Sequence, residues 1–254
     1  MNSVLADILE TGLLRTANGS GAVKAHSSIS SSEGRFLQRL IQQLDPTVTL
    51  EVGLAYGISA LFICDALNMR NETQHIAIDP NQHGGESGRG WEGIGIANLR
   101  RAGYGDIVRL IEEPSYRALA KLESSGQRID FAFIDGWHTF DFALVDFFFI
   151  DRMLNVGGVV VFDDADWPAI RKVCRFVKTN LAYSVLNIGD PALDNRERSP
   201  KRRLAENLLH RSQPGRFLPP DVIDSDSSLG LDGFWLAFRK EADDRRRWDH
   251  FVDF

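Results

Sequence analysis

Cysteine is scarce in this sequence, which has two cysteines among 254 residues. Cys64 and Cys174 lie inside apolar patterns that are typical of helices, and their spacing does not match a metal-binding arrangement. A chain with so few cysteines fits a reducing compartment, so we expect a cytoplasmic protein.

Long hydrophobic runs are absent as well. Apolar segments such as 60–64 and 147–150 are far shorter than the roughly 20 residues needed to cross a bilayer. Asp7 and Glu10 stand where a secretory signal peptide carries basic and then apolar residues. We therefore expect neither a membrane span nor a secretory leader.

An excess of basic residues is also missing, because 35 acidic and 29 basic residues give a net charge of −6. Proteins that bind nucleic acids usually carry a basic excess, so we expect no nucleic-acid partner. The segment 190–216 differs, with seven basic and four acidic residues. We favour a solvated helix that packs through Leu204, Leu208 and Leu209, and recognition of an anionic acceptor stays open.

The composition does provide for a core, being 43% hydrophobic with 16 phenylalanines and 5 tryptophans. Short apolar or β-branched runs without strict alternation predict strands that are covered on both faces. Because these runs alternate with helical patterns, we expect an α/β fold with a doubly wound, Rossmann-like sheet, mostly parallel with an antiparallel last strand. The expected strands are 47–52, 75–78, 107–111, 129–134, 156–162, 183–188 and 233–239, and the expected helices are 3–14, 33–44, 59–68, 93–102, 116–124 and 140–153.

The chain is expected to have two parts and no internal repeat. Residues 1–30 form an appendage, with a helix followed by a loop without periodicity that runs over 16–32. Residues 31–254 form one domain, which opens with a helix capped at Ser32 and carries a basic insertion at about 190–230.

A glycine-rich turn follows the first strand of this domain. Gly53 and Gly57 allow the backbone to turn tightly and to approach a ligand, and the next helix begins with free N–H groups. A plain strand-to-helix turn is the alternative. The small residues fall in the order G-x-A-x-G, which differs from the G-x-G-x-x-G of dinucleotide-binding turns and argues against NAD.

Asp79 ends the second strand, 22 positions after Gly57. A carboxylate at this place can accept both hydroxyls of a ribose beside the turn. The alternative is an aspartate that caps a turn before Pro80. Together with the glycine-rich turn, Asp79 favours an adenosine-containing ligand.

Acidic residues end the next two strands that are predicted for the sheet. Asp135 ends one, and Asp163 and Asp164 end the other. Three converging carboxylates repel one another unless a cation or hydrogen-bond donors are present, and such oxygen ligands suit Mg²⁺, Mn²⁺ or Ca²⁺. The alternative is that Asp163 and Asp164 cap the helix that begins near Pro168. His138 can serve as a general base over the same cleft, or can bond the turn at a helix start.

These features together resemble the class I S-adenosylmethionine (SAM)-dependent methyltransferases. Within that superfamily they are similar to the metal-dependent O-methyltransferases that act on small molecules and sugars. The resemblance covers about residues 30–176, and five motifs carry it in order: 51–57, 79–81, 112–115, 134–138 and 157–164. The sequence departs from the pattern at Ala55, where the wider superfamily often has glycine, and at Trp137 in the variable position before His138.

The resemblance also implies a role for each matching residue. The side chains or backbone that would line the amino-acid half of SAM are Glu51, Gly53, Ala55, Tyr56, Gly57 and Ser59. Asp79, with Asn81 beside it, would hold the ribose, and Glu113 and Ser115 would border the adenine. Asp135 would face both the methionine part of SAM and a metal ion that Asp163 and Asp164 complete, and the catalytic residues would be Asp135, His138 and Asp163.

We therefore expect a SAM-dependent methyltransferase that methylates a hydroxyl of a small molecule or sugar with the help of a divalent metal. Three other functions stay open: a metal-independent N-methyltransferase, an NAD(P)-dependent oxidoreductase, and a non-catalytic Rossmann-like binding or dimerisation module. The acceptor could be anionic or sugar-linked. A homodimer formed through the apolar face of the N-terminal helix is a further open option.

Overall fold

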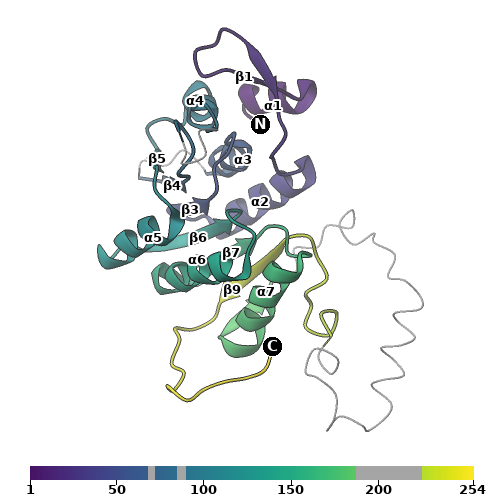
Figure 1. The fold of residues 1–254 in the computed structure, drawn as a ribbon, viewed down its shortest axis with the longest axis vertical. Helices are drawn as coiled ribbons and strands as arrows, with labels where there is room; N and C mark the ends of the chain where they lie inside the picture. Colours follow the sequence, from purple (N-terminus) through teal and green to yellow (C-terminus); the bar gives the residue numbers. More distant parts are fainter. Residues whose placement is uncertain (68–71, 85–89, 187–224) are drawn as a thin grey trace, which may run out of the picture.

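The computed structural model describes residues 1–67, 72–84, 90–186 and 225–254, and it has two layers of helices around one sheet (Figure 1). The strands are β1 (Leu13–Arg15), β2 (Ala22–Lys24), β3 (Val48–Val52), β4 (Gln74–Ile78), β5 (Val108–Ile111), β6 (Ile129–Ile134), β7 (Leu154–Phe162), β8 (Tyr183–Val185) and β9 (Leu236–Lys240). The helices are α1 (Ser3–Thr11), α2 (Ser31–Leu44), α3 (Ile58–Ala66), α4 (Ile94–Arg101), α5 (Ser115–Ser124), α6 (Phe140–Met153) and α7 (Pro168–Asn180).

The main sheet has seven strands in the order β5-β4-β3-β6-β7-β9-β8. Neighbouring strands from β5 to β7 are parallel, and β9 runs antiparallel between β7 and β8. The predicted fold class is therefore confirmed, including the antiparallel last strand. The strand order changes direction at β3, and ligands of open α/β sheets bind at the carboxyl ends of the strands beside such a point.

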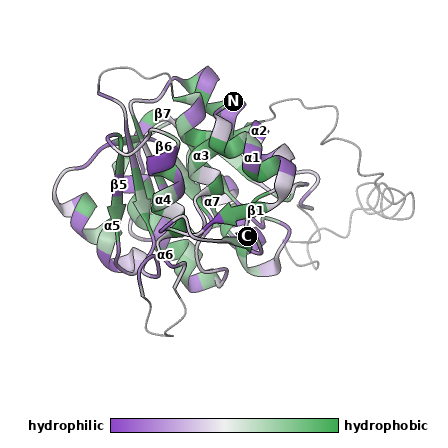
Figure 2. Ribbon diagram, turned by 90° about the horizontal axis from the view of Figure 1, so that it is seen from above, coloured by the Kyte–Doolittle hydropathy of each residue, from purple (hydrophilic) through white to green (hydrophobic). Residues whose placement is uncertain are grey.

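Both faces of the sheet are covered, as the strand pattern predicts. Helices α1 to α4 lie on one face, where Leu37 and Phe62 pack with Phe131 of the sheet. Helices α5 to α7 lie on the other face, where Phe147 packs with Ala132. Successive residues of a strand point to opposite faces, and Figure 2 shows apolar residues gathered in the central strands.

Helix α2 begins two residues earlier than the prediction from Ser32. The Ser30 hydroxyl accepts a hydrogen bond from the Glu33 N–H at 3.2 Å, so Ser30 is the capping residue. A Cβ atom on Gly34 would collide with the ring of Phe62. The glycine therefore lets α2 lie directly against α3, which fixes the position of the first turn of α2.

The N-terminal segment differs from the expected helix 3–14 and loop 16–32. Helix α1 ends at Thr11 because Gly12 takes a left-handed conformation, with φ of 68°. Strands β1 and β2 then form an antiparallel hairpin. The apolar residues Leu5 and Ile8 of α1 are buried in the protomer's own core, so the apolar face expected to form a dimer contact is already covered.

Several sequence expectations concern residues that the structure does not describe. The basic segment 196–216 and most of the expected insertion fall within 187–224, as does the end of the expected strand 183–188. The division of the chain at residue 30 stays a prediction. Among the described residues, no helix combines the length and the apolar composition that a membrane crossing requires.

Candidate functional site

The glycine-rich turn connects β3 to α3 and touches the end of β6. Gly53 has φ of 95°, and a Cβ atom there would collide with the carbonyl oxygen of Asp135. Gly57 has φ of 75°, and its Cβ would lie 2.9 Å from the carbonyl oxygen of Gly95. Only glycine meets both the conformation and the space at these positions. Ala55 also has a positive φ, of 45°.

The Asp79 carboxylate holds this turn from the end of β4. Its Oδ2 accepts hydrogen bonds from the N–H groups of Leu54 at 3.2 Å and Ala55 at 2.7 Å. Its Oδ1 accepts one from the N–H of Asn81 at 2.8 Å, which is the turn-capping bond of the alternative interpretation. A carboxylate has about four acceptor sites, so Oδ1 keeps capacity for a further donor such as a ribose hydroxyl.

Two buried amide side chains, which the sequence analysis did not single out, also hold the turn. Gln82 donates to the Ala55 carbonyl at 2.7 Å and to Asp79 Oδ2 at 3.2 Å. Asn98 donates to the Tyr56 carbonyl at 2.9 Å. Neither residue carries a local sequence signal, since each reaches the turn from a different segment.

Glu51 and Ser59 lie in the core beside the turn. The Ser59 hydroxyl donates to Glu51 Oε2 at 2.9 Å. Glu51 Oε1 lies 3.3 Å from Nε2 of His75, and both side chains are fully buried. The Nδ1 of His75 lies 2.9 Å from the hydroxyl of Thr49. This buried chain of polar groups keeps the Glu51 carboxyl in one orientation next to the start of α3.

Two rings cover Tyr56, His26 from the N-terminal segment and Trp91 from the connection between β4 and α4. Its hydroxyl lies 2.6 Å from Nε2 of His26, and its ring meets Trp91 edge to face at 5.0 Å. His26 also lies 5.9 Å from the Trp91 ring. Three segments that are distant in the sequence therefore meet beside the turn.

The structure brings the three predicted acids and His138 together at the ends of β6 and β7. Nε2 of His138 lies 3.0 Å from Asp164 Oδ2 and 3.5 Å from Asp135 Oδ1. The hydrogen bond and charge of Asp135, followed by the charges of Asp164 and Asp163, raise the pKa of His138. Burial raises the pKa of Asp135 to about 7, helped by the charge of Asp163 and opposed by His138.

Glu33 joins this acidic group from the first turn of α2. It is 4% exposed, and its carboxyl lies near that of Asp163. Burial, followed by the neighbouring carboxylates, raises its pKa to about 10. Its Oε1 has no hydrogen-bond partner in the described part of the chain.

Sequence reasoning missed Glu33 because it fits the pattern of a capping box. In that motif the glutamate three positions after the capping serine bonds back to the serine N–H. The available signal was its helical phase, since Glu33 shares the buried face of α2 with Leu37 and Leu40.

The acids at the end of β7 do not cap the next helix, so that alternative is wrong. Helix α7 is preceded by Trp167 and, within the described ranges, has no side-chain cap. Asp163 Oδ1 instead accepts from the Asp164 N–H at 2.7 Å, and Asp164 has φ of 46°. The Trp167 ring packs 5.2 Å from the His138 ring.

The donor set suits a divalent cation by its chemistry. Carboxylate oxygens are the ligands that Mg²⁺ and Ca²⁺ prefer, and burial, followed by the neighbouring carboxylates, raises the pKa values of Glu33 and Asp135. The orphaned Oε1 of Glu33 belongs to the same group. As the side chains lie, however, no three His, Cys, Asp or Glu residues among those described are arranged around one ion position.

The two residues predicted to border the adenine, Glu113 and Ser115, point in different directions. Glu113 forms an ion pair with Lys121, with Nζ 2.6 Å from Oε2, and so points along α5. Ser115 begins α5, and its side chain lies next to the buried carboxyl of Asp146. Of these two residues, Ser115 is therefore the one tied to a buried polar group.

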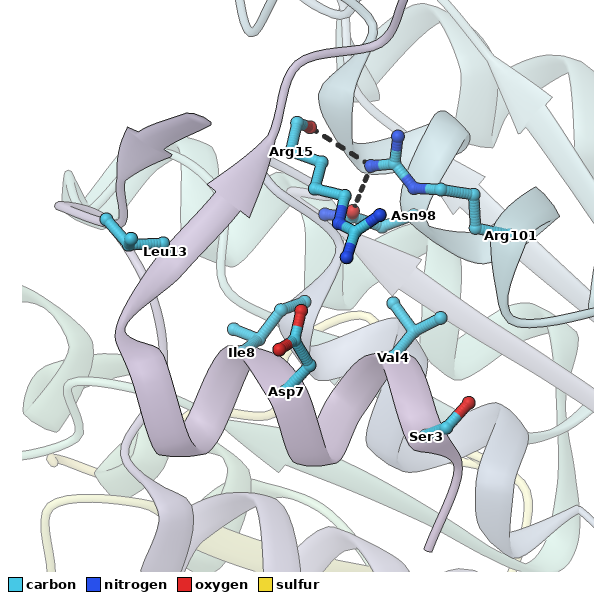
Figure 3. A pocket seen from close by; sticks show the side chains of 8 residues that line it. All are labelled: Ser3, Val4, Asp7, Ile8, Leu13, Arg15, Asn98 and Arg101. Atoms are coloured by element: carbon cyan, nitrogen blue, oxygen red, sulfur yellow. Dashed lines mark hydrogen bonds between the residues drawn. The ribbon is translucent and has the colours of Figure 1, made fainter. Parts of the chain in front are cut away.

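A separate hollow of about 390 Å³ lies between α1, β1 and α4 (Figure 3). Arg101 crosses it and donates to the carbonyls of Arg15 and Thr16 and to Oδ1 of Asn98. No residue of the predicted site lines it; its lining residues are Ser3, Val4, Asp7, Ile8, Leu13, Arg15, Asn98 and Arg101. Asn98 connects this hollow to the glycine-rich turn through its hydrogen bond to the Tyr56 carbonyl.

Comparison with known proteins finds similarity to methyltransferases over the central part of the chain. Residues 50–165 match a family described as a methyltransferase domain. A caffeoyl-CoA O-methyltransferase of Populus kitakamiensis is 28% identical over 146 residues, which cover 55% of this chain and 56% of that protein. Tapetum-specific methyltransferase 1 of Arabidopsis thaliana is 25% identical over 170 residues, 65% of each chain. The chain thus spans less than two thirds of the length of these relatives.

Solved structures share the fold. The O-methyltransferase from Bacillus cereus, in complex with SAH, superposes with a TM-score of 0.58 at 20% identity, covering 73% of this chain and 83% of that one. The O-methyltransferase TomG from Streptomyces achromogenes, in complex with SAM, gives a TM-score of 0.57 at 17% identity, covering 73% and 82%. At these identities the likeness shows the architecture of the domain.

Proposed function

We propose that this chain transfers the methyl group of SAM to a hydroxyl of a small molecule, since residues 50–165 match a family described as a methyltransferase domain and the fold is shared with a solved O-methyltransferase. One observation carries the proposal: the glycine-rich turn and the acidic group abut, with Gly53 against the carbonyl of Asp135. A cofactor on the turn and an acceptor among the acids would therefore be neighbours, which direct transfer requires.

The residues around the turn would hold SAM. Gly53 and Gly57 let the turn lie directly against the backbone of Asp135 and Gly95, and the N–H groups of the turn and of the start of α3 would face the cofactor. The remaining acceptor capacity of Asp79 Oδ1 supports its role toward the ribose. Glu51 and Ser59 would serve the amino-acid half of SAM through the start of α3.

The acidic group would serve the acceptor. We propose that Asp135, Asp163 and Asp164 hold a divalent ion, Mg²⁺ in the first place, with Mn²⁺ or Ca²⁺ as alternatives. A bound ion supplies Lewis acidity that lowers the pKa of an acceptor hydroxyl. Glu33, whose carboxyl lies near that of Asp163, would help to keep the Asp163 carboxyl in place.

His138 is positioned to take the proton in this scheme. The acceptor oxygen forms a bond to the methyl carbon, the carbon–sulfur bond breaks, and its electron pair stays on sulfur. The hydroxyl proton would go to the imidazole of a neutral His138, whose charged form Asp135 and Asp164 would stabilise, with their carboxylates 3.5 and 3.0 Å from Nε2.

The acceptor class follows from the relatives, which include caffeoyl-CoA O-methyltransferases. We propose a phenolic or sugar hydroxyl on a small molecule, with an anionic group as one option. The cytoplasmic location and a homodimer stay predictions.

A methylation assay tests the proposal. The full chain is incubated with isotope-labelled SAM and a panel of catechols, caffeoyl-CoA and nucleotide-linked sugars, with Mg²⁺ or with a chelator, and the products are analysed by mass spectrometry. We expect methyl ethers that form with Mg²⁺ and disappear in Asp163→Ala. Methylated amines formed without metal would favour the N-methyltransferase, and binding of NADH without binding of SAM would favour the oxidoreductase.

A further inference from the structure

The hollow between α1, β1 and α4 lies apart from the candidate site and has no role in the proposed reaction (Figure 3). Its volume of about 390 Å³ falls within the range of small-molecule sites, roughly 300–1,000 Å³. Each of the three elements contributes one charged side chain to its lining: Asp7 from α1, Arg15 from β1 and Arg101 from α4. The partners of these three charges decide what the hollow can bind.

Arg101 is held in place by neutral acceptors. Its Nη1 donates to the Thr16 carbonyl at 3.1 Å, and its Nη2 donates to the Arg15 carbonyl at 3.0 Å and to Oδ1 of Asn98 at 2.6 Å. No carboxylate of the described residues pairs with it, so its charge lacks a counter-ion. A guanidinium has five N–H donors, and two therefore remain for a ligand on a side chain that is already fixed.

The guanidinium of Arg15 has neither a hydrogen bond nor an ion pair in the part of the chain that the structure describes. Figure 3 shows it directed toward α1. Burial, followed by the charge of Arg15, lowers the pKa of Arg101, as expected for two guanidinium groups that lie close together. Like charges beside one hollow favour an anionic ligand, and a carboxylate matches a guanidinium with two parallel hydrogen bonds.

Asp7 adds the opposite charge from α1. Within the described ranges its carboxylate has no ion pair and no hydrogen bond, so it does not neutralise Arg15. A carboxylate in the lining repels a simple anion and attracts an ammonium group. The apolar part of the lining consists of Val4, Ile8 and Leu13. A ligand that satisfies all of these groups carries a carboxylate, an ammonium group and an apolar side chain.

We propose that this hollow binds an α-amino acid with an apolar side chain. Arg15 and Arg101 would hold its carboxylate, Asp7 would hold its ammonium group, and its side chain would lie against the apolar part of the lining. This site is distinct from the proposed cofactor and acceptor sites, and the inference does not depend on the proposed function.

A calorimetric titration of the full chain with L-leucine tests the proposal. Excess S-adenosylhomocysteine is present throughout, to block the amino-acid half of the proposed cofactor site. The same titration uses 4-methylpentanoate, which lacks the amino group, and 3-methylbutylamine, which lacks the carboxylate. We expect saturable binding of L-leucine at one site, and binding of both analogues at least about tenfold more weakly, because each loses charge-assisted hydrogen bonds. Absence of saturable binding for L-leucine, L-valine and L-methionine alike would overturn the proposal.

Two variants locate the binding. Arg15→Gln and Asp7→Asn should each weaken binding of L-leucine at least about tenfold. Both side chains are exposed and unpaired, so these variants should keep the melting temperature of the wild type. Lys24→Gln, on the same hairpin, and Glu10→Gln, on the same helix, are the matched controls, because both residues are exposed outside the hollow and should leave the affinity unchanged. Unchanged affinity in Arg15→Gln or Asp7→Asn, or 4-methylpentanoate binding as tightly as L-leucine, would overturn the inference.

Discussion

The two sides of the candidate site use the same residue type in opposite ways. On the turn side, Asp79 is buried and accepts from three backbone N–H groups and Gln82. On the acidic side, Glu33 and Asp135 face other carboxylates, and both have raised pKa values. A carboxyl surrounded by donors supports the fold, whereas one surrounded by carboxyls is left poised for a cationic or proton-donating ligand.

The backbone explains the difference. The turn after β3 takes positive φ at Gly53, Ala55 and Gly57, which directs the N–H groups of residues 54 and 55 toward Asp79. At the end of β7 the backbone offers Asp163 the N–H of Asp164. The two sides thus differ in how many backbone N–H groups donate hydrogen bonds to their carboxyl groups.

The largest effect on binding and stability is expected from a substitution at Gly53, where the turn side contacts the acidic side. In Gly53→Ala the new Cβ would collide with the Asp135 carbonyl, so we expect SAM binding to be lost and the melting temperature to fall steeply. Gly126→Ala is the matched control, since Gly126 has φ of 78° with open space around it and bears the conformational cost of about 1–2 kcal/mol alone. Equal melting temperatures for the two variants would contradict the contact.

Removal of the Asp79 carboxyl should affect the turn side alone. Asp79→Ala leaves the N–H groups of Leu54 and Ala55 without their acceptor, at about 1–3 kcal/mol for each buried group. We expect SAM to bind about 100-fold more weakly, as measured by calorimetry, and the protein to be less stable. The exposed Asp106→Ala should change neither quantity, and undiminished SAM binding in Asp79→Ala would refute the role given to this side.

Neutralising Glu33 should stabilise the protein, the reverse of the effect at Asp79. Its pKa is about 10 in the fold and 4.5 in its ordinary state. The folded state therefore holds the proton of Glu33 more tightly than the unfolded state does. The stabilisation from this protonated carboxyl is fully present below pH of about 4.5 and is lost as the pH rises toward 10. Glu33→Gln should melt a few degrees higher than wild type at pH 8 and nearly equally at pH 4.5. The exposed Glu10→Gln is the control, and a lower melting temperature of Glu33→Gln at pH 8 would refute the electrostatic account.

The smallest effect concerns the titration of His138 in chelator-treated protein. Asp135 and Asp164 stabilise the imidazolium, so its pKa should lie above 6.5. Asp164→Asn removes one of these charges and should lower that pKa, which nuclear magnetic resonance can follow on the His138 ring. Asp141→Asn should leave it in place, and an upward shift in Asp164→Asn would show that Asp164 does not face the ring as a carboxylate.

Most of the sheet could be predicted because its strands are short but nearly continuous apolar or β-branched runs. The strand 129–134 and the helix 140–153 match the prediction to the residue. The hairpin of β1 and β2 was not predicted, because strands of three residues carry no periodic signal. The end of α1 was missed because the apolar pattern continues past Gly12 into β1.

The positions of site residues could be predicted where the sheet topology fixes them. They could not be predicted where they depend on contacts between side chains that are distant in the sequence. The carboxyl ends of neighbouring parallel strands must meet, which brings Asp135 next to Asp163 and Asp164. Glu33 contacts Asp163 from a helix 130 positions away in the sequence, and no local pattern records that contact. Glu113 points away because Lys121, two helical turns on, offers an ion pair.

The most direct test of the two-sided account is a calorimetric titration of SAM into chelator-treated wild type and Asp163→Ala, with turnover measured in parallel. The account predicts the same affinity for SAM in both proteins, with turnover in the variant lowered about 10³-fold once Mg²⁺ is restored. Absence of SAM binding in the wild type, or its loss in Asp163→Ala, would contradict the account.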